Sequence, residues 1–159
     1  MRRPGCKLSR SLLLRLELKS NPRLLSVVRA AVKSLTEVSG FSAHGCRSVT
    51  RAVDEALSNI MRHSYGGLLG EPITLYFRRI QRRFDAGTDC GLEVQLWDHG
   101  VKFDPTSAPV RQLKELRPGG LGLHFIRQAV DTIEYRRVGR TNRLRLIKYL
   151  ADHKSQPDC

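Results

Sequence analysis

Apolar and polar residues alternate one by one in several separated segments of this chain, and this period of two most restricts the fold. The apolar positions are Leu12, Leu14, Leu16 and Leu18, then Ile73, Leu75 and Phe77, then Leu92, Val94 and Leu96, and finally Leu144 and Leu146. A further strand is expected at residues 133–138. Because successive side chains of a strand point to opposite faces of its sheet, each segment predicts a strand with one wet face. This pattern disfavours a parallel sheet covered on both sides and favours a mixed, mostly antiparallel sheet.

Three other segments repeat their apolar residues at helical spacing. The first is expected to stop at Gly40, and its apolar stripe consists of Leu24, Val28, Ala31, Leu35 and Val38. The second is expected from about Ala43 to His63, and the third over residues 121–130. Strands with one wet face and helices with one apolar stripe predict an α/β (α+β) two-layer sandwich, with the helices on one face of the sheet.

The length and charge of the chain restrict its organisation and its partners. With 159 residues it is long enough for one domain with a core, expected over residues 1–150, followed by a flexible tail at 151–159. Its 40% apolar and 27% charged residues are typical of a soluble globular protein. The formal net charge of +13 favours polyanionic ligands or an acidic partner surface, because such a charge attracts anions over long distances.

Two features indicate the compartment. The apolar run near the N-terminus is interrupted by Arg10 and Arg15, so neither a signal-peptide core nor a membrane span is expected. The four cysteines lie far apart without a Cys-x-x-Cys pair, which argues against a zinc site or a disulfide framework. Both features favour a cytoplasmic protein that makes no contact with membranes.

One border of the second predicted helix carries Glu55, Asn59 and His63, each four residues apart. Residues at this spacing stack along one face of a helix, here beside the apolar stripe, where a ligand can be half enclosed. The Glu55 carboxylate is ionised at neutral pH and can accept a proton. The Asn59 carbonyl oxygen suits Mg²⁺ that is also bound by phosphates. His63 could contact phosphate or stabilise the helix end, and the whole border could also be a solvated helix edge.

Two glycine segments lie further along the chain. Asp98-x-Gly100 ends a predicted strand, where the carboxylate can accept a hydrogen bond from an exocyclic amine and the glycine permits a sharp turn beneath a bound ring. An ordinary Asp-x-Gly turn is the alternative. Gly119, Gly120 and Gly122 open the third helix, although glycine costs about 1 kcal/mol inside a helix. A phosphate at the backbone N–H groups of this helix start would explain them, whereas tight helix packing would require no ligand.

The ordered set resembles the GHKL, or Bergerat-fold, ATPase superfamily, with Glu55-x3-Asn59-x3-His63 as its N box and the two glycine segments as its glycine boxes. The compact size, the ending of the N box and the short segment between the glycine boxes look most like the anti-sigma-factor serine/threonine kinases, which have a histidine-kinase-like ATPase domain. This resemblance implies a Bergerat ATP-binding fold with ATP and Mg²⁺ as cofactors. It also implies a homodimer that holds a sigma factor and phosphorylates an anti-anti-sigma (STAS-type) antagonist on Ser or Thr.

The resemblance further implies a role for each matching residue. Glu55 would be the catalytic base for the acceptor hydroxyl, Asn59 the magnesium ligand, and Asp98 the acceptor of the adenine amine. Gly100 would lie under the adenine ring. The other residues expected at the nucleotide are His63, Lys102, Gly119, Gly120, Leu121, Gly122 and Thr141.

Two positions depart from the pattern of this family. Lys102 replaces the second glycine of the usual Asp-x-Gly-x-Gly sequence, and Pro118 stands where the second glycine box often begins. A non-catalytic, nucleotide-gated protein-interaction switch is therefore one alternative. Another is a basic nucleic-acid-binding module, suggested by the arginines at 78–79, 82–83, 136–137, 140, 143 and 145. Only 6% of the residues are aromatic and the arginines are expected on wet faces of strands, so nucleic acid is the less favoured partner.

Overall fold

The structure of the protein, a computed structural model, describes residues 7–84, 87–104 and 121–150. In chain order its elements are β1 (Lys7–Lys19), the 3-10 helix η1 (Pro22–Leu24), α1 (Leu25–Val38), α2 (Ala43–Asn59), the π-helix η2 (Ile60–Ser64), β2 (Pro72–Phe84), β3 (Gly87–Asp98), α3 (Leu121–Ala129), β4 (Thr132–Val138) and β5 (Thr141–Tyr149). The strands form one sheet in the order β1-β2-β3-β5-β4, and every neighbouring pair is antiparallel. The predicted antiparallel character is confirmed, and the described strands include no parallel pair.

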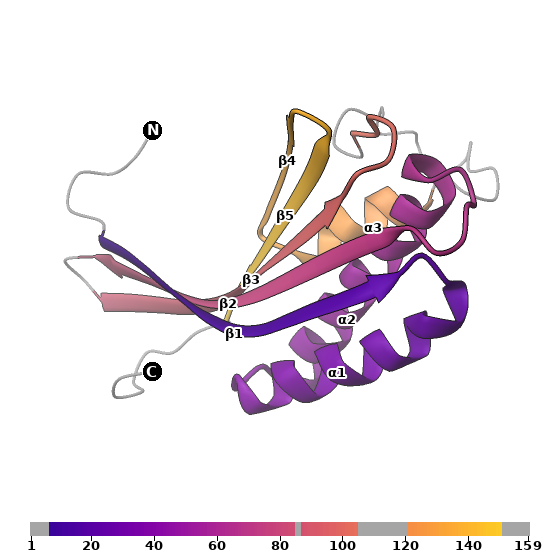
Figure 1. The fold of residues 1–159 in the computed structure, drawn as a ribbon. Coiled ribbons are helices and arrows are strands. Elements are labelled where there is room, and N and C mark those ends of the chain that lie inside the picture. Colours follow the sequence, from indigo (N-terminus) through magenta and orange to yellow (C-terminus); the bar gives the residue numbers. More distant parts are fainter. Residues whose placement is uncertain (1–6, 85–86, 105–120, 151–159) are drawn as a thin grey trace.

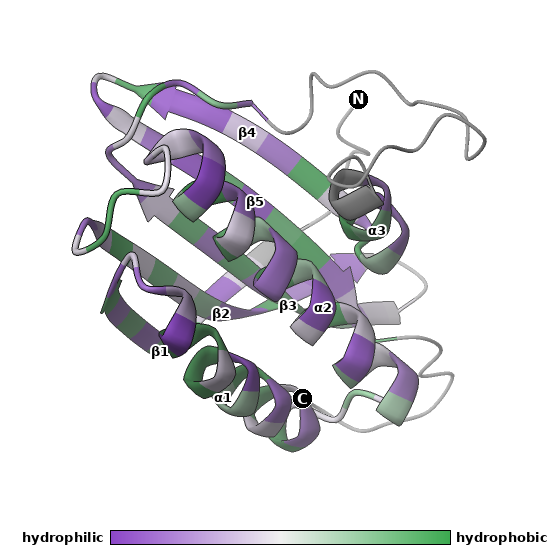
Figure 2. Cartoon of the chain, turned by 90° about the vertical axis from the view of Figure 1, so that its right-hand side faces the viewer, coloured by the Kyte–Doolittle hydropathy of each residue, from purple (hydrophilic) through white to green (hydrophobic). Residues whose placement is uncertain are grey.

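The three α-helices lie together on one face of the sheet (Figures 1 and 2). The core fills the space between the two layers and combines the apolar stripes of α1 and α2 with the inward residues of the strands. Its largest fully buried side chains include Leu57, Ile73, Leu75, Phe77 and Leu96. Burying one such side chain stabilises the fold by roughly 1.5–3 kcal/mol. The predicted two-layer sandwich is therefore confirmed.

Short polar side chains and one glycine define the limits of the first two helices. The Oδ1 atom of Asn21 accepts a hydrogen bond from the backbone N–H of Arg23 at 3.0 Å, at the start of η1. The hydroxyl of Ser42 accepts one from Gly45 N at 3.1 Å, at the start of α2. Each cap satisfies a backbone donor that has no partner within the first helical turn. After α1, Gly40 adopts a φ of 85°, the left-handed conformation that favours glycine, so the predicted stop is confirmed.

Strand β1 contains an irregularity that the sequence pattern did not reveal. The pairing register with β2 shifts between Leu12 and Leu14, so Leu13 is an extra residue in the strand. Leu14, Leu16 and Leu18 contact the core as predicted. Leu12 is 56% exposed, and the expectation that it shares their buried face was wrong. One inserted residue is enough to move the side chains beyond it to the opposite face.

The second helix changes its form before the predicted end at His63. It is α-helical to Asn59 and π-helical from Ile60 to Ser64, where Tyr65 N donates to the carbonyl of Ile60 at 2.9 Å. A π turn holds more residues than an α turn, so the side chains after Asn59 lie at different angles from those that α-helical spacing predicts. Ser64 and Tyr65 are brought into the interior, with exposures of 3% and 6%, whereas His63 is exposed.

None of the helices in the described ranges has the length and apolarity needed to span a lipid bilayer.

Cys46, on α2, is a buried free cysteine. Cys90, on β3, forms a disulfide bond, which departs from the expectation drawn from the cysteine spacing. Spacing along the chain does not reveal which cysteines meet after folding.

Candidate functional site

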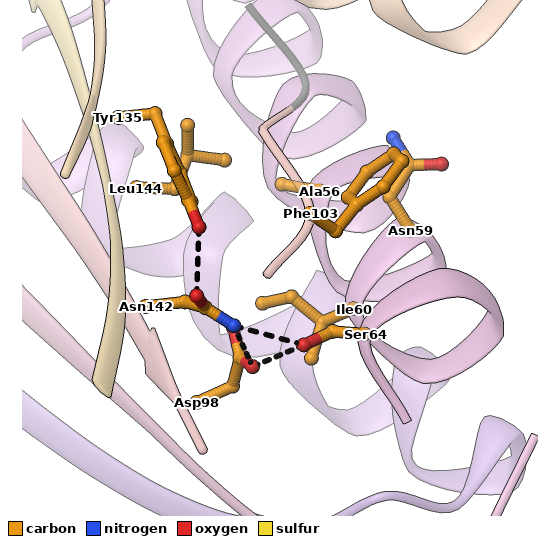
Figure 3. Close-up of a pocket in the computed structure, with 9 residues that line it drawn as sticks. All are labelled: Ala56, Asn59, Ile60, Ser64, Asp98, Phe103, Tyr135, Asn142 and Leu144. Atoms are coloured by element: carbon orange, nitrogen blue, oxygen red, sulfur yellow. Dashed lines mark hydrogen bonds between the residues drawn. The ribbon is translucent and has the colours of Figure 1, made fainter. Parts of the chain in front are cut away.

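A pocket lies between the C-terminal end of α2, the π-helix η2 and the strands β3, β4 and β5 (Figure 3). Its lining residues are Ala56, Asn59, Ile60, Ser64, Asp98, Phe103, Tyr135, Asn142 and Leu144. Figure 3 shows Ser64, Asp98 and Asn142 gathered together, with Asn59 and Phe103 apart from them. The pocket therefore has a hydrogen-bonded polar end and a second polar group on α2, separated by apolar walls.

Asp98 is the buried carboxylate of this pocket, with an exposure of 3%. Its Oδ1 atom accepts hydrogen bonds from Asn142 Nδ2 at 2.8 Å, from Gly100 N at 3.0 Å and from the Ser64 hydroxyl. A buried carboxylate destabilises a fold unless hydrogen bonds replace its lost hydration. Several donors on one oxygen also fix the position of the group, so Asp98 is a preorganised acceptor.

Asn142, which is 1% exposed, holds the polar end together. Its Nδ2 atom also donates to the carbonyl of Val101 at 2.9 Å. Its Oδ1 atom accepts hydrogen bonds from the Tyr135 hydroxyl at 2.7 Å and from Arg137 Nη1 at 2.6 Å. Because both donors reach the same oxygen, a reversed amide would place its NH₂ group against two donors. Burial raises the pKa of Tyr135, so its hydroxyl remains a donor at neutral pH.

The first glycine segment is tied closely to the helix end. A Cβ atom at Gly100 would overlap the backbone carbonyl of Ser64, so no other residue fits there without a shift of the backbone. Val101 N donates to the same Ser64 carbonyl at 2.8 Å. Arg137 Nη1 donates to the carbonyl of Gly100 at 3.1 Å, which links the segment to β4. The close approach explains why a glycine follows Asp98 at this distance.

Tyr65 secures the segment between Asp98 and Gly100. Its hydroxyl donates to the carbonyl of Pro72 at 2.6 Å and accepts a hydrogen bond from His99 N at 2.9 Å. Burial raises the pKa of Tyr65, although the hydrogen bond from His99 acts in the opposite direction. Tyr65 directly follows the π turn, as the residue that caps its C-terminal end.

Two of the predicted site residues, Asn59 and Asp98, line the same pocket. Asn59 is 8% exposed. Glu55 lies one turn before it on α2, outside the pocket lining, with its side chain 25% exposed. The Oε1 atom of Glu55 is 3.4 Å from Arg62 Nη2. The structure therefore places Glu55 at the rim of the site, close to solvent.

His63 and Thr141, two other predicted residues, are not part of the pocket lining. The His63 ring stacks on Phe103 with 4.7 Å between centroids and 23° between planes, so it supports a wall of the pocket. The Thr141 hydroxyl is 3.2 Å from His99 Nδ1. On β5 the residue that lines the pocket is Asn142, directly after Thr141.

The second glycine segment is described only in part. Gly119 and Gly120 lie outside the described residues, and Leu121 and Gly122 are the first residues of α3. The start of a helix at this segment is thereby confirmed, while a phosphate contact there stays a prediction. Lys102, after the first segment, is exposed.

Sequence reasoning did not select Ser64, Phe103, Tyr135 or Asn142. A signal for Asn142 was present, because the alternation that directs Leu144 inward also directs the residue two positions earlier inward. Ser64 offered no comparable signal, since its inward position depends on the π turn.

The side-chain atoms of the pocket that can bind a metal decide which metal ion it could hold. Within the described ranges there is no group of three or more His, Cys, Asp or Glu residues that could hold a metal ion. Asn59, which lines the pocket from α2, carries one neutral amide oxygen of the kind that can bind a metal. Magnesium sites commonly combine one or two protein ligands with waters and substrate phosphates. The residues therefore fit Mg²⁺ bound together with a phosphate, and not a metal held by the protein alone.

The five-stranded antiparallel sheet with its helices on one face is the two-layer arrangement of the GHKL fold. The histidine kinase-like ATPase domain family matches residues 18–148, which include every lining residue of the pocket. The chain belongs to this family. The resemblance to the GHKL superfamily that rested on the N box and the glycine boxes is confirmed.

Several characterised relatives are similar to this chain over most of its length. Serine/threonine-protein kinase BtrW of Bordetella bronchiseptica is 31% identical over 108 residues, which cover 65% of this chain and 70% of that protein. Serine-protein kinase RsbW of Listeria innocua is 25% identical over 127 residues, 75% of this chain and 76% of that protein. Serine-protein kinase RsbW of Bacillus cereus is 27% identical over 130 residues, 75% of this chain and 74% of that protein.

Proposed function

We propose that the protein is an ATP-dependent serine/threonine kinase of the anti-sigma-factor type. It would bind a sigma factor, phosphorylate an anti-anti-sigma (STAS-type) antagonist and act in the cytoplasm as a homodimer. One observation carries the proposal: the buried Asp98 and the Asn59 amide line one pocket, in a chain whose relatives are named serine-protein kinases.

The polar end of the pocket suits adenine. Its exocyclic amine is a hydrogen-bond donor, and the carboxylate of Asp98 is a buried acceptor. Asn142, Ser64 and Gly100 all donate to the Oδ1 atom of Asp98, so its Oδ2 atom would accept from the amine. The apolar lining residues would pack against the faces of the ring, as is usual in small-molecule pockets. These residues are Ala56, Ile60, Phe103 and Leu144.

The α2 end of the pocket would face the phosphates. Bound MgATP supplies the phosphoryl group and the positive charge that neutralises it during transfer. Asn59 would hold the metal through its amide oxygen, together with the phosphates of the nucleotide. The backbone N–H groups near Gly122, at the start of α3, would face the phosphates, because the positive end of the helix dipole favours anions.

Glu55 would accept the proton of the attacking hydroxyl on the antagonist. Its place at the rim suits this role, because the acceptor hydroxyl must enter from a partner protein. The side chain of Arg62 holds the carboxylate on that side through a contact of 3.4 Å. Neither residue lines the pocket, so a change of Glu55 or Arg62 would leave the residues around the nucleotide in place.

Calorimetric titration with ATP, with and without Mg²⁺, tests the proposal at its first step. We expect binding that strengthens with Mg²⁺, and loss of that strengthening in Asn59→Ala. Incubation with γ-labelled ATP and each purified STAS-type protein of the source organism then tests transfer. Binding without transfer to any of them would point to a nucleotide-gated interaction switch, and failure to bind ATP would overturn the proposal altogether.

A further inference from the structure

The face of the sheet opposite the helices carries a charged surface that the nucleotide site does not use. Figure 1 shows the three α-helices on the other face. The pairing registers direct alternate residues outward, away from the core positions Leu75, Leu96 and Leu144. We call the following set the outer arginine face: Arg15, Tyr76, Trp97, Arg136, Arg143 and Arg145.

Guanidinium groups on this face lie over aromatic rings. The Cζ atom of Arg143 is 4.1 Å from the centroid of the Trp97 ring. Arg15 and Arg78 lie over Tyr76, with distances of 5.5 Å and 5.0 Å to its centroid. Cation–π contacts of this kind hold long side chains in place while their N–H groups remain available for anions. Side chains that are already ordered lose less conformational freedom when a partner binds.

One corner of the outer arginine face has an excess of positive charge. Arg136 and Arg143 are direct cross-strand partners on β4 and β5. Like charges at such positions destabilise a sheet. The neighbouring Arg145 pairs with Glu93 at 2.7 Å and with Glu134 at 3.1 Å. Neither Arg136 nor Arg143 forms an ion pair in the described part of the chain, and the buried Nε atom of Arg143 has no hydrogen-bond partner there.

We infer that the outer arginine face is a docking surface for an acidic segment of a partner protein, with carboxylates paired to Arg136 and Arg143. A carboxylate between the two guanidiniums would relieve their repulsion and accept their N–H groups in the bidentate geometry that arginine favours. The net charge of +13 would attract such a partner from a distance. The inference does not depend on the nucleotide site, which lies on the other side of the sheet.

The same face suits an acidic protein segment better than nucleic acid. Sheets that bind single strands stack the bases on open aromatic rings, whereas the ring of Trp97 has the guanidinium of Arg143 over it. Glu17 and Glu134 also point to this face and would repel a continuous chain of phosphates. The carboxylates of an acidic protein segment are spaced by its sequence, so they can meet Arg136 and Arg143 without lying opposite the two glutamates.

Trp97 is the only tryptophan of the chain, so its fluorescence reports on this face directly. The probe is a short synthetic peptide rich in Glu and Asp, carrying a fluorophore for anisotropy. An oligothymidylate of equal net charge is the comparison. The test variant combines Arg136→Gln with Arg143→Gln. The control variant combines Arg23→Gln with Arg47→Gln, two exposed arginines outside the sheet, and has the same net charge.

The inference predicts saturable peptide binding that changes the Trp97 emission and is equally strong in the wild-type protein and the control variant. The test variant should bind about tenfold or more weakly, while its circular dichroism and its ATP titration remain unchanged. Equal weakening in the two variants would mean binding by bulk charge and would overturn the inference. Absence of peptide binding, or tighter binding of the oligothymidylate through the same arginines, would overturn it as well.

Discussion

Asp98 and Asn142 are direct partners across β3 and β5, and a hydrogen bond of 2.8 Å joins their side chains. Both point to the inner face of the sheet, where the neighbouring positions are apolar. Two polar side chains in such a place require a full set of hydrogen bonds, and the end of the helix supplies part of that set through Ser64. The pocket is therefore maintained by contacts between elements that are distant in sequence.

Asn142→Ala should lower the free energy of unfolding by about 1–3 kcal/mol, because it leaves buried donors and acceptors without partners. It should also weaken ATP binding, since Asp98 would lose one of its fixed donors. Thr141→Ala is the matched control on the same strand, because the hydrogen bond of its hydroxyl with His99 is exposed. Urea denaturation and ATP titration measure both effects. A larger loss of ATP affinity in Thr141→Ala would show that the wrong residue of β5 has been assigned to the site.

Gly100→Ala should destabilise the protein by about 1–3 kcal/mol, because the added Cβ would overlap the backbone of Ser64. The combination with Ser64→Ala should not restore stability, since the overlap involves the carbonyl group and not only the hydroxyl. Thermal unfolding of the single and double variants distinguishes these cases. Full recovery in the double variant would contradict the described approach of the two backbones.

Glu55→Gln and Asn59→Ala should separate transfer from binding. Glu55 lies outside the pocket lining, so its amide variant should keep its affinity for MgATP and lose phosphoryl transfer. Asn59→Ala should lose the Mg²⁺-dependent part of the affinity. Arg62→Ala is a second variant to compare with these two, because it removes the contact to Glu55 without changing a residue that lines the pocket. Equal loss of nucleotide binding in the Glu55 and Asn59 variants would refute the assigned roles.

The free energy of unfolding should fall as the pH rises above about 10. Burial raises the pKa of Tyr65 and of Tyr135 above their ordinary value of 10.0, so the folded protein retains these protons longer than the unfolded chain. Their contribution to stability is complete below pH 10.0 and is lost as the pH rises through the folded-state pKa values. Urea denaturation across this range should show a smaller decline for Tyr65→Phe. An unchanged slope in that variant would exclude Tyr65 as a source of the effect.

Glu93→Ala should lower the free energy of unfolding by about 3–5 kcal/mol. Its carboxylate is fully buried on the outer face and pairs with Arg145 at 2.7 Å, so its removal leaves a partly buried guanidinium without its main partner. Glu134→Ala removes the second, 43% exposed carboxylate of the same arginine and should cost less than about 1 kcal/mol. Similar losses in the two variants would contradict this ranking of the carboxylates.

Periodicity predicted the elements well and their irregularities poorly. The alternation around Leu75 and Leu96 identified strands because burial on one face imposes the period of two. The extra residue at Leu13 is invisible to that reasoning, since a bulge breaks the period without a distinctive residue type. The same holds for the site. Asp98 and Asn59 were predicted from their chemistry, whereas the inward position of Ser64 follows from hydrogen bonds formed only in the folded helix end.

The π turn at Ile60–Ser64 has a consequence for how this helix can evolve. It sets the angular phase between Asn59, on its N-terminal side, and Ser64, at its end, and both line the same pocket. Because a π turn closes with one residue more than an α turn, loss of one residue within it would restore ordinary α-helical winding and leave the following side chains at nearly the same angle. Ser64 would then still face Asp98 from the end of the helix. Replacing the π turn by an α turn without a deletion would instead rotate Ser64 away from the pocket, so the extra residue and the wider turn must be gained or lost together.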